Sequence, residues 1–358
     1  MKEMTRIFDP GALQDFARQA FEAVGMATHL SDRVALILLE GDLMGHDTHG
    51  LALLPAYLSS AEAGGMTLQG EPEILNEKPA AALWDGKMLP GPWLISEGFK
   101  LAVKQAKIYG TYTLSIRHSH HTAGLISYLK PVTDTGMIAM LSVSDPTEAC
   151  VVPFGGKAPL LSTNPIAYGI PTEDGAVMLD MSTSQTTNGM VNRRYRQQKY
   201  FDHDWLINDN GEPSRDPAVR FTTPPGAIMP LGGFSSGHKG TGLGIVVEAL
   251  THGLSGNGRV LQPKCWENNV FLQVIDPEAF AGQNHFASET GFLGQQIRNC
   301  PPVDISRPVR VPGERALTLR AQRLREGVPL SDDILSGLYP WADKFNLQLP
   351  EAKQSNVA

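Results

Sequence analysis

A hydroxyl and an imidazole stand side by side at Thr48 and His49, in a short polar stretch between two apolar segments. Polar groups held among apolar ones must either satisfy one another or do chemistry. We interpret His49 as a catalytic proton donor on a turn, with Thr48 beside it. Gly50 lets the backbone approach a ligand closely, and His46 and Asp47 add titratable groups. The alternative is a structural histidine next to a threonine that caps the following helix.

A second polar group, His118-Ser119-His120-His121, follows an expected strand and precedes a helix. Site residues of α/β proteins commonly lie at such positions. A metal site is the alternative, although His-x-His-His without a nearby Cys or Glu is a weak ligand pattern. Asp180 ends another expected strand. It either caps the next helix or orients an imidazole as the third group of a proton relay.

Glycines precede an expected helix at Gly232-Gly233 and in the stretch 238–244. Such glycines suit a phosphate or a dinucleotide, or they allow close packing of helices. Lys239 lies in the second stretch, but no Ser or Thr follows it directly, as a P-loop requires. The chain also lacks a Gly-x-Gly-x-x-Gly fingerprint in a strand-to-helix context. A dinucleotide site must therefore differ from the Rossmann type.

The first secondary-structure elements that position these residues are expected to be helices. Apolar residues recur at helical spacing after the caps Asp9-Pro10 and Ser31-Asp32, and a third helix is expected over about 53–63. Three apolar residues lie on faces that one helical layer cannot fully cover: Phe16, Phe21 and Leu38. These faces favour an apolar, helix-rich contact with another subunit.

Helices and strands then alternate. Strands are expected over 74–85, 111–117, 137–143, 177–180 and 269–275, and helices over 92–110, 122–135, 241–254 and 315–326. The stretch 199–230 is rich in Pro, Gly and Asp and reads as a long loop, of the kind that forms lids or cofactor walls. The order predicts a helical part from both chain ends around an α/β centre.

The composition excludes several classes of protein. The chain has 358 residues, enough for a large core, and a net charge of −7 without a basic patch, so nucleic acid and membranes are not expected partners. No apolar run could span a bilayer, and the first residues lack the apolar core of a signal peptide. The three cysteines are far apart, which favours a reduced, cytoplasmic protein. The tail after Glu351 is expected to be frayed.

Eight short motifs occur in a characteristic order. They are Gly-His-Asp-Thr-His-Gly (45–50), Arg-His-Ser-His-His (117–121), Val-Pro-Phe-Gly-Gly (152–156), Ser-Thr-Asn-Pro-Ile-Ala (162–167), Leu-Asp-Met-Ser-Thr-Ser (179–184), Pro-Leu-Gly-Gly (230–233), His-Lys-Gly (238–240) and Val-Pro-Gly-Glu (311–314). No single motif is decisive, but eight in register are specific. Over nearly its whole length the chain resembles the malate/L-lactate dehydrogenase family, which also includes sulfolactate, ureidoglycolate, diketogulonate and piperideine-2-carboxylate oxidoreductases.

The resemblance implies an α/β (α+β) fold, with a non-Rossmann, mixed-sheet cofactor-binding domain and a helical domain built from both chain ends. We expect residues 1–75 to form the helical segment with the proton donor and 76–300 the cofactor- and substrate-binding region. Residues 301–358 would return to the helical part. The resemblance further implies an NAD- or NADP-dependent enzyme that is usually a homodimer and acts on a small molecule.

The family's site residues can be carried over by motif. Its Ser-His pair falls on Thr48-His49, its relay aspartate on Asp180 and its second site histidine on His121, while Lys239 would help to position the substrate. The family's cofactor-lining segments fall on nine candidate residues: Tyr168, Ile170, Thr172, Met229, Leu231, Arg310, Pro312, Gly313 and Glu314.

One departure from the family affects the substrate. The arginine that usually follows the proton donor by four residues, and that helps to hold the substrate carboxylate, is Leu53 here. We expect Lys239 or Arg117 to take over the carboxylate, with Leu53 as an apolar wall. The second departure is at residues 118–123, where the family commonly has Asn-Ser-Asn-His-Phe-Gly and this chain has His-Ser-His-His-Thr-Ala.

These observations predict hydride transfer between a nicotinamide and C2 of a 2-hydroxy or 2-oxo acid, with His49 as proton donor. The alternative substrate is a cyclic imino acid such as piperideine-2-carboxylate. Two other classes stay open. One is a metal-dependent hydrolase that uses His46, His49, His118 and His121, and the other is a dinucleotide-binding protein without catalysis.

Overall fold

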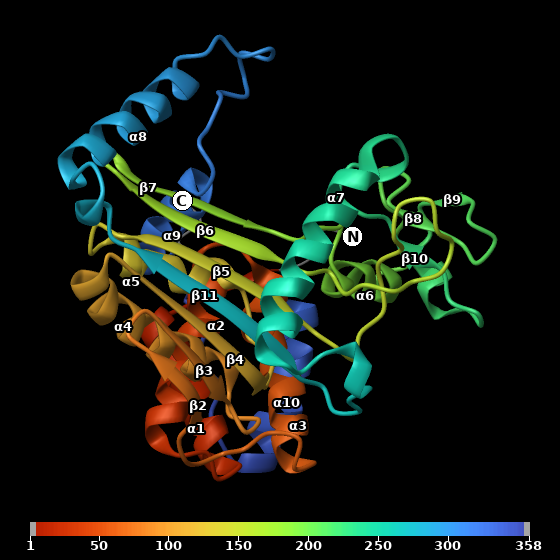
Figure 1. Cartoon of the computed structure of the whole chain (residues 1–358). Helices are drawn as coiled ribbons and strands as arrows, with labels where there is room; N and C mark the ends of the chain where they lie inside the picture. The colour runs from red at the N-terminus through yellow and green to blue at the C-terminus, as the bar shows by residue number, and fades with distance from the viewer. Residues whose placement is uncertain (1–4, 354–358) are drawn as a thin grey trace.

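The computed structural model describes residues 5–353 (Figure 1). The predicted frayed tail lies partly outside this range, at residues 354–358, as do the first four residues of the chain. Among the described helices, none combines the length and the apolar character needed to cross a membrane.

The starts of the first two helices were predicted from local sequence, one correctly and one not. α1 (Pro10–Ala23) begins as predicted, with the Asp9 carboxylate accepting a hydrogen bond from the Ala12 amide at 3.1 Å. α2 (Thr28–Leu43) begins earlier than predicted, with Ala27 as its cap. Ser31 is inside α2, and its hydroxyl donates to the Ala27 carbonyl at 2.9 Å. The predicted Ser31-Asp32 cap is wrong, because this hydroxyl bonds back to the preceding turn.

Both chain ends contribute to the helical layer, as predicted. β1 (Thr5–Phe8) pairs antiparallel with β12 (Val328–Ser331). α9 (Glu314–Glu326) contacts α2, and α10 (Asp332–Phe345) contacts α1 and α3 (Leu54–Glu62).

The C-terminal helices cover the apolar faces of the N-terminal helices that we expected to be open. Phe16, Phe21 and Leu38 are buried within the subunit, so the prediction that they need another subunit is wrong. Large apolar side chains are exposed elsewhere, on α7 (Gly233–Glu248), on α8 (Gln283–Arg298) and in the segment that follows α8. They include Leu243, Ile245, Val246, Phe292, Leu293, Val303 and Ile305.

A seven-stranded mixed sheet forms the centre of the molecule (Figure 1). Its order is β2 (Glu73–Lys78), β3 (Ala81–Asp85), β4 (Thr111–Ser119), β11 (Asn268–Ile275), β5 (Ile138–Ser144), β6 (Ile166–Thr172) and β7 (Gly175–Met181). β3 and β4 are parallel, whereas the other neighbours in this sheet pair antiparallel. A doubly wound Rossmann sheet is parallel, so the predicted non-Rossmann, mixed-sheet fold is confirmed.

Helices pack closely on this sheet. α4 (Gly91–Tyr109) contacts β4 and β11, and Gly98 makes the approach possible. A Cβ atom at Gly98 would lie 2.8 Å from the Leu114 side chain and 2.9 Å from that of Leu272. The predicted helix over 122–135 is shorter than expected, with a 3-10 turn over Leu125–Tyr128 followed by α5 (Leu129–Thr133).

The expected long loop over 199–230 is a small lobe, at the right of the view in Figure 1. It contains a three-stranded sheet of β10 (Ala227–Ile228), β8 (Leu206–Ile207) and β9 (Pro213–Ser214) beside α6 (Asn188–Arg196). An apolar cluster of its own stabilises the lobe and includes Cys150, Val191, Phe201, Leu206 and Ile228. Strands this short give too weak a pattern to be recognised in sequence.

Candidate active site

The buried carboxylate of Asp42 stabilises the turn that carries His49. Asp47–His49 form a 3-10 turn after α2, and Asp42 at the end of α2 accepts a hydrogen bond from the Leu51 amide at 2.7 Å. A Cβ atom at Gly50 would lie 2.4 Å from the Asp42 carboxylate. Gly50 is therefore required for contact with Asp42, where we had expected contact with a ligand. Burial raises the pKa of Asp42 to about 8.

The same turn is held by the C-terminal helix. The Arg323 guanidinium on α9 donates a hydrogen bond to the Asp42 carbonyl oxygen and lies 3.4 Å from the Asp47 carboxylate. The guanidinium thus ties the end of α2 to the catalytic turn from a third element.

His49 is paired with its neighbour. The Thr48 hydroxyl lies 2.9 Å from Nδ1 of His49, which leaves Nε2 as the nitrogen that can exchange a proton with a ligand. Burial, aided by repulsion from His46, lowers the pKa of His49 to about 4. His49 is therefore a neutral imidazole at pH 7.

His121 lies next to His49, as the resemblance implied, with ring centroids 6.4 Å apart. Its Nδ1 accepts a hydrogen bond from the Ala123 amide at 3.3 Å and lies 2.8 Å from the Tyr57 hydroxyl. The proton of the neutral ring is therefore on Nε2. Trp266 packs against His121 at 5.0 Å. Burial and the two neighbouring histidines hold the pKa of His121 well below its usual value.

The remaining histidines of the second motif have other partners. His120 Nε2 is 2.9 Å from the Ser60 hydroxyl, and His118 Nδ1 is 3.0 Å from the Asp85 carboxylate. Arg117 also pairs with Asp85, at 2.9 Å. Within residues 5–353, no three His, Cys, Asp or Glu side chains gather as metal ligands. The hydrolase hypothesis therefore gains no support from the geometry.

Two cavities meet at the turn that carries His49. The large cavity has a volume of about 660 Å³ and the small cavity about 320 Å³. Both are lined by Thr48, His49, Ala123, Leu125, Thr163, Pro165 and Thr187. Asp180 lines the large cavity, whereas Leu53, His121 and Trp266 line the small one. A proton on His49 can thus reach a ligand in either cavity.

Asp180 is near the catalytic turn, but its contacts differ from a simple relay. Its carboxylate accepts a hydrogen bond from the Ile126 amide at 2.8 Å. Burial raises its pKa, and the charge of His46 opposes that rise. In the described part of the chain no hydrogen bond joins Asp180 to His49, so its electrostatic partner in the turn is His46.

The strand β7 runs from the large cavity, which Asp180 lines, to a third cavity, which Ala176 lines. Side chains alternate along a strand, so Ala176, Met178 and Asp180 share one face over about 13 Å. Gly313 approaches this face so closely that a Cβ atom there would lie 2.7 Å from the Met178 Cβ. The Pro312 carbonyl accepts a hydrogen bond from the Met178 amide at 2.9 Å.

The third cavity, here called the arginine cavity, has a volume of about 470 Å³. Ala176, Arg310, Glu314 and Arg315 are among its lining residues. Glu314 forms an ion pair with Arg298. Arg310, Pro312, Gly313 and Glu314 are thus brought together at the far end of the β7 face.

The other cofactor candidates divide into two groups. Leu231 lines the large cavity, and the Met229 carbonyl accepts a hydrogen bond from the amide of Gln185, another lining residue, at 2.9 Å. Tyr168, Ile170 and Thr172 point to the opposite face of the sheet, because Ala167 is the residue of β6 that pairs with Asp180. They line none of these three cavities.

Comparison with known proteins decides the family. Residues 8–339 match the family described as malate/L-lactate dehydrogenase. The chain belongs to this family. It is 28% identical to malate/(S)-sulfolactate dehydrogenase of Methanothermus fervidus, over 96% of the chain and 99% of that protein. It is 29% identical to Δ1-pyrroline-2-carboxylate/Δ1-piperideine-2-carboxylate reductase of Pseudomonas syringae pv. tomato, over 91% and 93%.

The fold agrees with that of malate dehydrogenase from Entamoeba histolytica, with a TM-score of 0.91, 24% identity and coverage of 97% of this chain and 100% of that chain. Since its relatives in the malate/L-lactate dehydrogenase family are dehydrogenases and reductases, the protein is an oxidoreductase.

The family's carboxylate-binding arginine has no replacement among the residues we had expected. Leu53 lines the small cavity, as predicted for an apolar wall. Lys239 is exposed on α7 and lines neither cavity at His49, because its position places it on the outer side of that helix. Arg117 is occupied by Asp85. Sequence reasoning also missed Tyr57, Trp266 and Asp42.

Proposed function

We propose that the protein transfers a hydride between the nicotinamide of NAD or NADP and C2 of a small 2-hydroxy or 2-oxo acid. The single observation that supports this best is the Thr48–His49 pair on the wall shared by the large and small cavities. One cavity can hold the nicotinamide and the other the substrate, with the proton donor between them.

The large cavity and the arginine cavity lie at opposite ends of β7, and together they suit different parts of a dinucleotide. Gly313 lets the segment 310–314 pack directly against β7 at Met178, where a side chain would collide. Arg310 and Arg315 provide cations for phosphate. Gly232 and Gly233 start α7 beside the large cavity, and a helix N-terminus also attracts phosphate. The bound nicotinamide would supply the hydride chemistry, and the protein orientation and the proton.

His49 handles the proton in this proposal. In reduction, an imidazolium at His49 gives its Nε2 proton to the oxygen on C2 as that oxygen gains the electron pair of the C=O bond. In oxidation, the neutral imidazole takes the hydroxyl proton. The low pKa of His49 favours the neutral form, and a substrate carboxylate nearby would raise that pKa toward neutrality.

The first turn of α6 can bind the substrate carboxylate in place of the missing arginine. Thr187, Asn188, Gly189 and Asn192 all line the small cavity. A Cβ atom at Gly189 would lie 3.9 Å from His49 Cε1, so this helix end is adjacent to the catalytic ring. The positive end of a helix and its free amides favour an anion. Asp180 and His46 would complete the polar wall on the cofactor side.

A cyclic imino acid is the second candidate substrate. Leu53 and Trp266 give the small cavity apolar surfaces that suit a ring, and the Pseudomonas relative is named for two cyclic imines. In this reaction His49 would protonate the nitrogen rather than the oxygen.

We further propose a homodimer. The exposed apolar side chains of α7 and α8 form the type of surface that marks an interface on an otherwise polar protein. A second copy of this chain is the partner that the resemblance implies. Light scattering over a range of concentrations should give twice the mass of 38.8 kDa. A constant monomer mass would contradict the proposal.

A substrate panel tests the function. We expect oxidation of NADH or NADPH, read at the nicotinamide absorbance, with at least one 2-oxo acid or cyclic imine. The His49→Ala variant should bind the same cofactor but turn over at least a hundredfold more slowly. Failure of the whole panel with both cofactors would overturn the proposed function.

A further inference from the structure

The lining of the small cavity has an unusual charge balance. Within residues 5–353, no Lys or Arg lines it, whereas two carboxylates do, those of Asp145 and Glu148. Glu148 lies 3.4 Å from Arg220, which is not part of the lining. Burial raises the pKa of Asp145. A second acid group on a substrate would face these carboxylates, and no cation among the described lining residues would bind it.

An unsatisfied acceptor lines the same cavity. Asn268 is 4% exposed, and its Oδ1 has no hydrogen-bond partner among the described residues. Its amide nitrogen is already used, as a donor to the Glu267 carbonyl at 3.0 Å. A buried acceptor without a donor is unfavourable. A ligand with an N–H group would satisfy it.

The carboxylates are presented by a rigid turn. Asp145 Oδ1 accepts hydrogen bonds from the amide and the hydroxyl of Thr147, at 2.7 and 2.6 Å. Behind the turn, the Arg259 guanidinium donates to the carbonyls of Glu148 at 2.8 Å and of Asp145 at 3.4 Å. A wall that is already ordered loses little entropy when a ligand binds.

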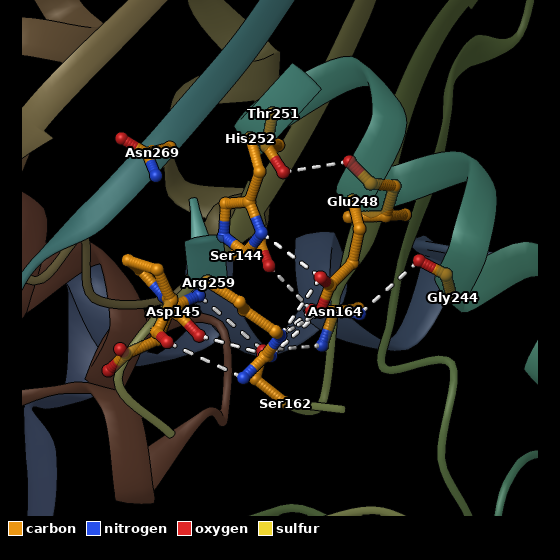
Figure 2. Close-up of polar contacts among 12 residues, drawn as sticks. Ser144, Asp145, Ser162, Asn164, Gly244, Glu248, Thr251, His252, Arg259 and Asn269 are labelled. Atoms are coloured by element: carbon orange, nitrogen blue, oxygen red, sulfur yellow. Dashed lines mark hydrogen bonds and ion pairs between the residues drawn. The ribbon is translucent and has the colours of Figure 1, made fainter. Parts of the chain in front are cut away.

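A buried network fixes that guanidinium in turn. Figure 2 shows the Glu248 carboxylate joined to Arg259, His252 and the amide of Asn164. The three contacts measure 2.7, 3.0 and 3.2 Å, respectively. Asn164 Oδ1 accepts from the hydroxyls of Ser144 and Ser162, at 2.7 and 2.6 Å, and both serines line the small cavity. The hydrogen bonds from His252 and Arg259 outweigh the effect of burial and lower the pKa of Glu248 to about 2, so this anchor stays ionised.

We propose that Asp145, Glu148 and Asn268 select a substrate whose side chain ends in hydrogen-bond donors, such as an amide, a guanidinium or an ammonium group. The inference rests on the proposed function, since it takes the small cavity as the substrate site. The first turn of α6 would hold the carboxylate beside His49, and the acceptors would hold the far end. The specificity would then differ from that of relatives named for malate or sulfolactate, which are dianions.

Matched pairs of 2-oxo acids test this selection. The first pair is oxaloacetate and its monoamide 2-oxosuccinamate, which differ little in shape. The second is 2-oxo-5-guanidinopentanoate and 2-oxohexanoate, whose side chain is uncharged. We expect kcat/KM to favour the donor-bearing member of each pair by about tenfold or more, with most of the difference in KM.

Two variants locate the effect, and one serves as a control. Asp145→Asn keeps the acceptor of the turn but removes its charge, and it should reduce the preference for the donor-bearing members about tenfold. Glu148→Gln, at the residue that pairs with Arg220, should reduce it in the same direction. Asp85→Asn is the matched control, because Asp85 also accepts a turn amide, from Lys87 at 2.9 Å, but lines neither cavity at His49. Its preference should equal that of the unmodified protein.

The outcomes separate the two proposals. Turnover with equal or greater use of oxaloacetate would overturn the selection by donors and leave the proposed function intact. An unchanged preference in Asp145→Asn and Glu148→Gln, with normal thermal midpoints, would also overturn it. Lack of turnover with all four compounds and with the rest of the substrate panel, with NADH and with NADPH, would overturn both.

Discussion

The hydroxyl of Thr48 lies 2.9 Å from Nδ1 of His49, the ring that follows it in the chain. This contact limits rotation of the His49 side chain. Nε2 therefore keeps a constant orientation at the wall that the two cavities share. A serine, which the resemblance implies at this position, would provide the same hydroxyl.

Removal of that hydroxyl should slow the enzyme. We expect Thr48→Val, which keeps the shape of the side chain, to lower kcat about tenfold, because a net hydrogen bond of about 1.4 kcal/mol corresponds to that factor. Thr48→Ser should retain most of the activity. Steady-state kinetics of the two variants checks this, and equal rates would contradict an orienting role for the hydroxyl.

Loss of the imidazole should be more severe. His49→Ala should lower kcat by roughly 10²–10⁴-fold, the usual contribution of a general acid or base, with little change in the cofactor Kd. Asp180→Asn should also slow turnover. If the two act as a unit, the double variant will be little slower than His49→Ala alone. A near-normal kcat for His49→Ala would exclude it as the proton donor.

The pH dependence should report the low pKa of His49. Oxidation of the 2-hydroxy acid needs the neutral ring, which is the dominant form above a pKa of about 4. The value of kcat/KM for oxidation should therefore be flat between about pH 5.5 and 8, whereas a histidine with an ordinary pKa of about 6.5 would cause a rise through that range. An inflection near pH 6.5 that is absent from a cofactor-binding control would refute this prediction.

An arginine at the position of Leu53 should change the substrate preference. Leu53→Arg places a cation in the wall of a cavity that has none among the described lining residues. We expect the ratio of kcat/KM for oxaloacetate over 2-oxohexanoate to rise about tenfold or more, which corresponds to roughly 1.4 kcal/mol. Leu53→Met changes the shape without the charge and should leave the ratio nearly unchanged. Efficient oxaloacetate reduction by the unmodified protein would contradict the premise.

Asp42 should make stability depend on pH. Its pKa is about 8 in the folded protein and near 3.8 when unfolded, so ionisation favours unfolding progressively as the pH rises from about 4 to 8. Asp42→Asn keeps an acceptor for the Leu51 amide and does not ionise. The Tm of this variant minus that of the unmodified protein should become more positive from pH 5 to pH 8. A difference that is independent of pH would mean that Asp42 is ionised throughout.

Local features of the fold could be predicted from the sequence because they depend on neighbouring residues. Asp9-Pro10 predicted the start of α1. The family motifs pointed to Thr48, His49, Leu53 and His121, which the structure brings together around two adjoining cavities. The start of α2 was missed because Ser31 bonds to Ala27 within the helix rather than capping it.

Other features depend on contacts between distant segments. Tyr57 and Trp266 meet His121 only after α3, β4 and the segment before β11 are assembled. In the sequence, Asp42 is an ordinary polar residue at a helix end. Its burial results from the segments that follow it and pack over the end of α2. Tyr168 lies on the opposite sheet face because of its register with β7, and no periodicity within β6 alone reveals that register.

Arg323 holds the turn of His49 from the far end of the chain. A ribosome adds about 5–20 residues per second, so roughly 14–55 s separate the synthesis of the proton donor from that of its support. Before α9 has left the ribosome, the nascent chain lacks the Arg323 guanidinium that ties the end of α2 to Asp47. The turn of His49 therefore gains this support only after α9 has been synthesised, and fragments truncated before α9 should contain Thr48, His49 and Asp180 and still be inactive.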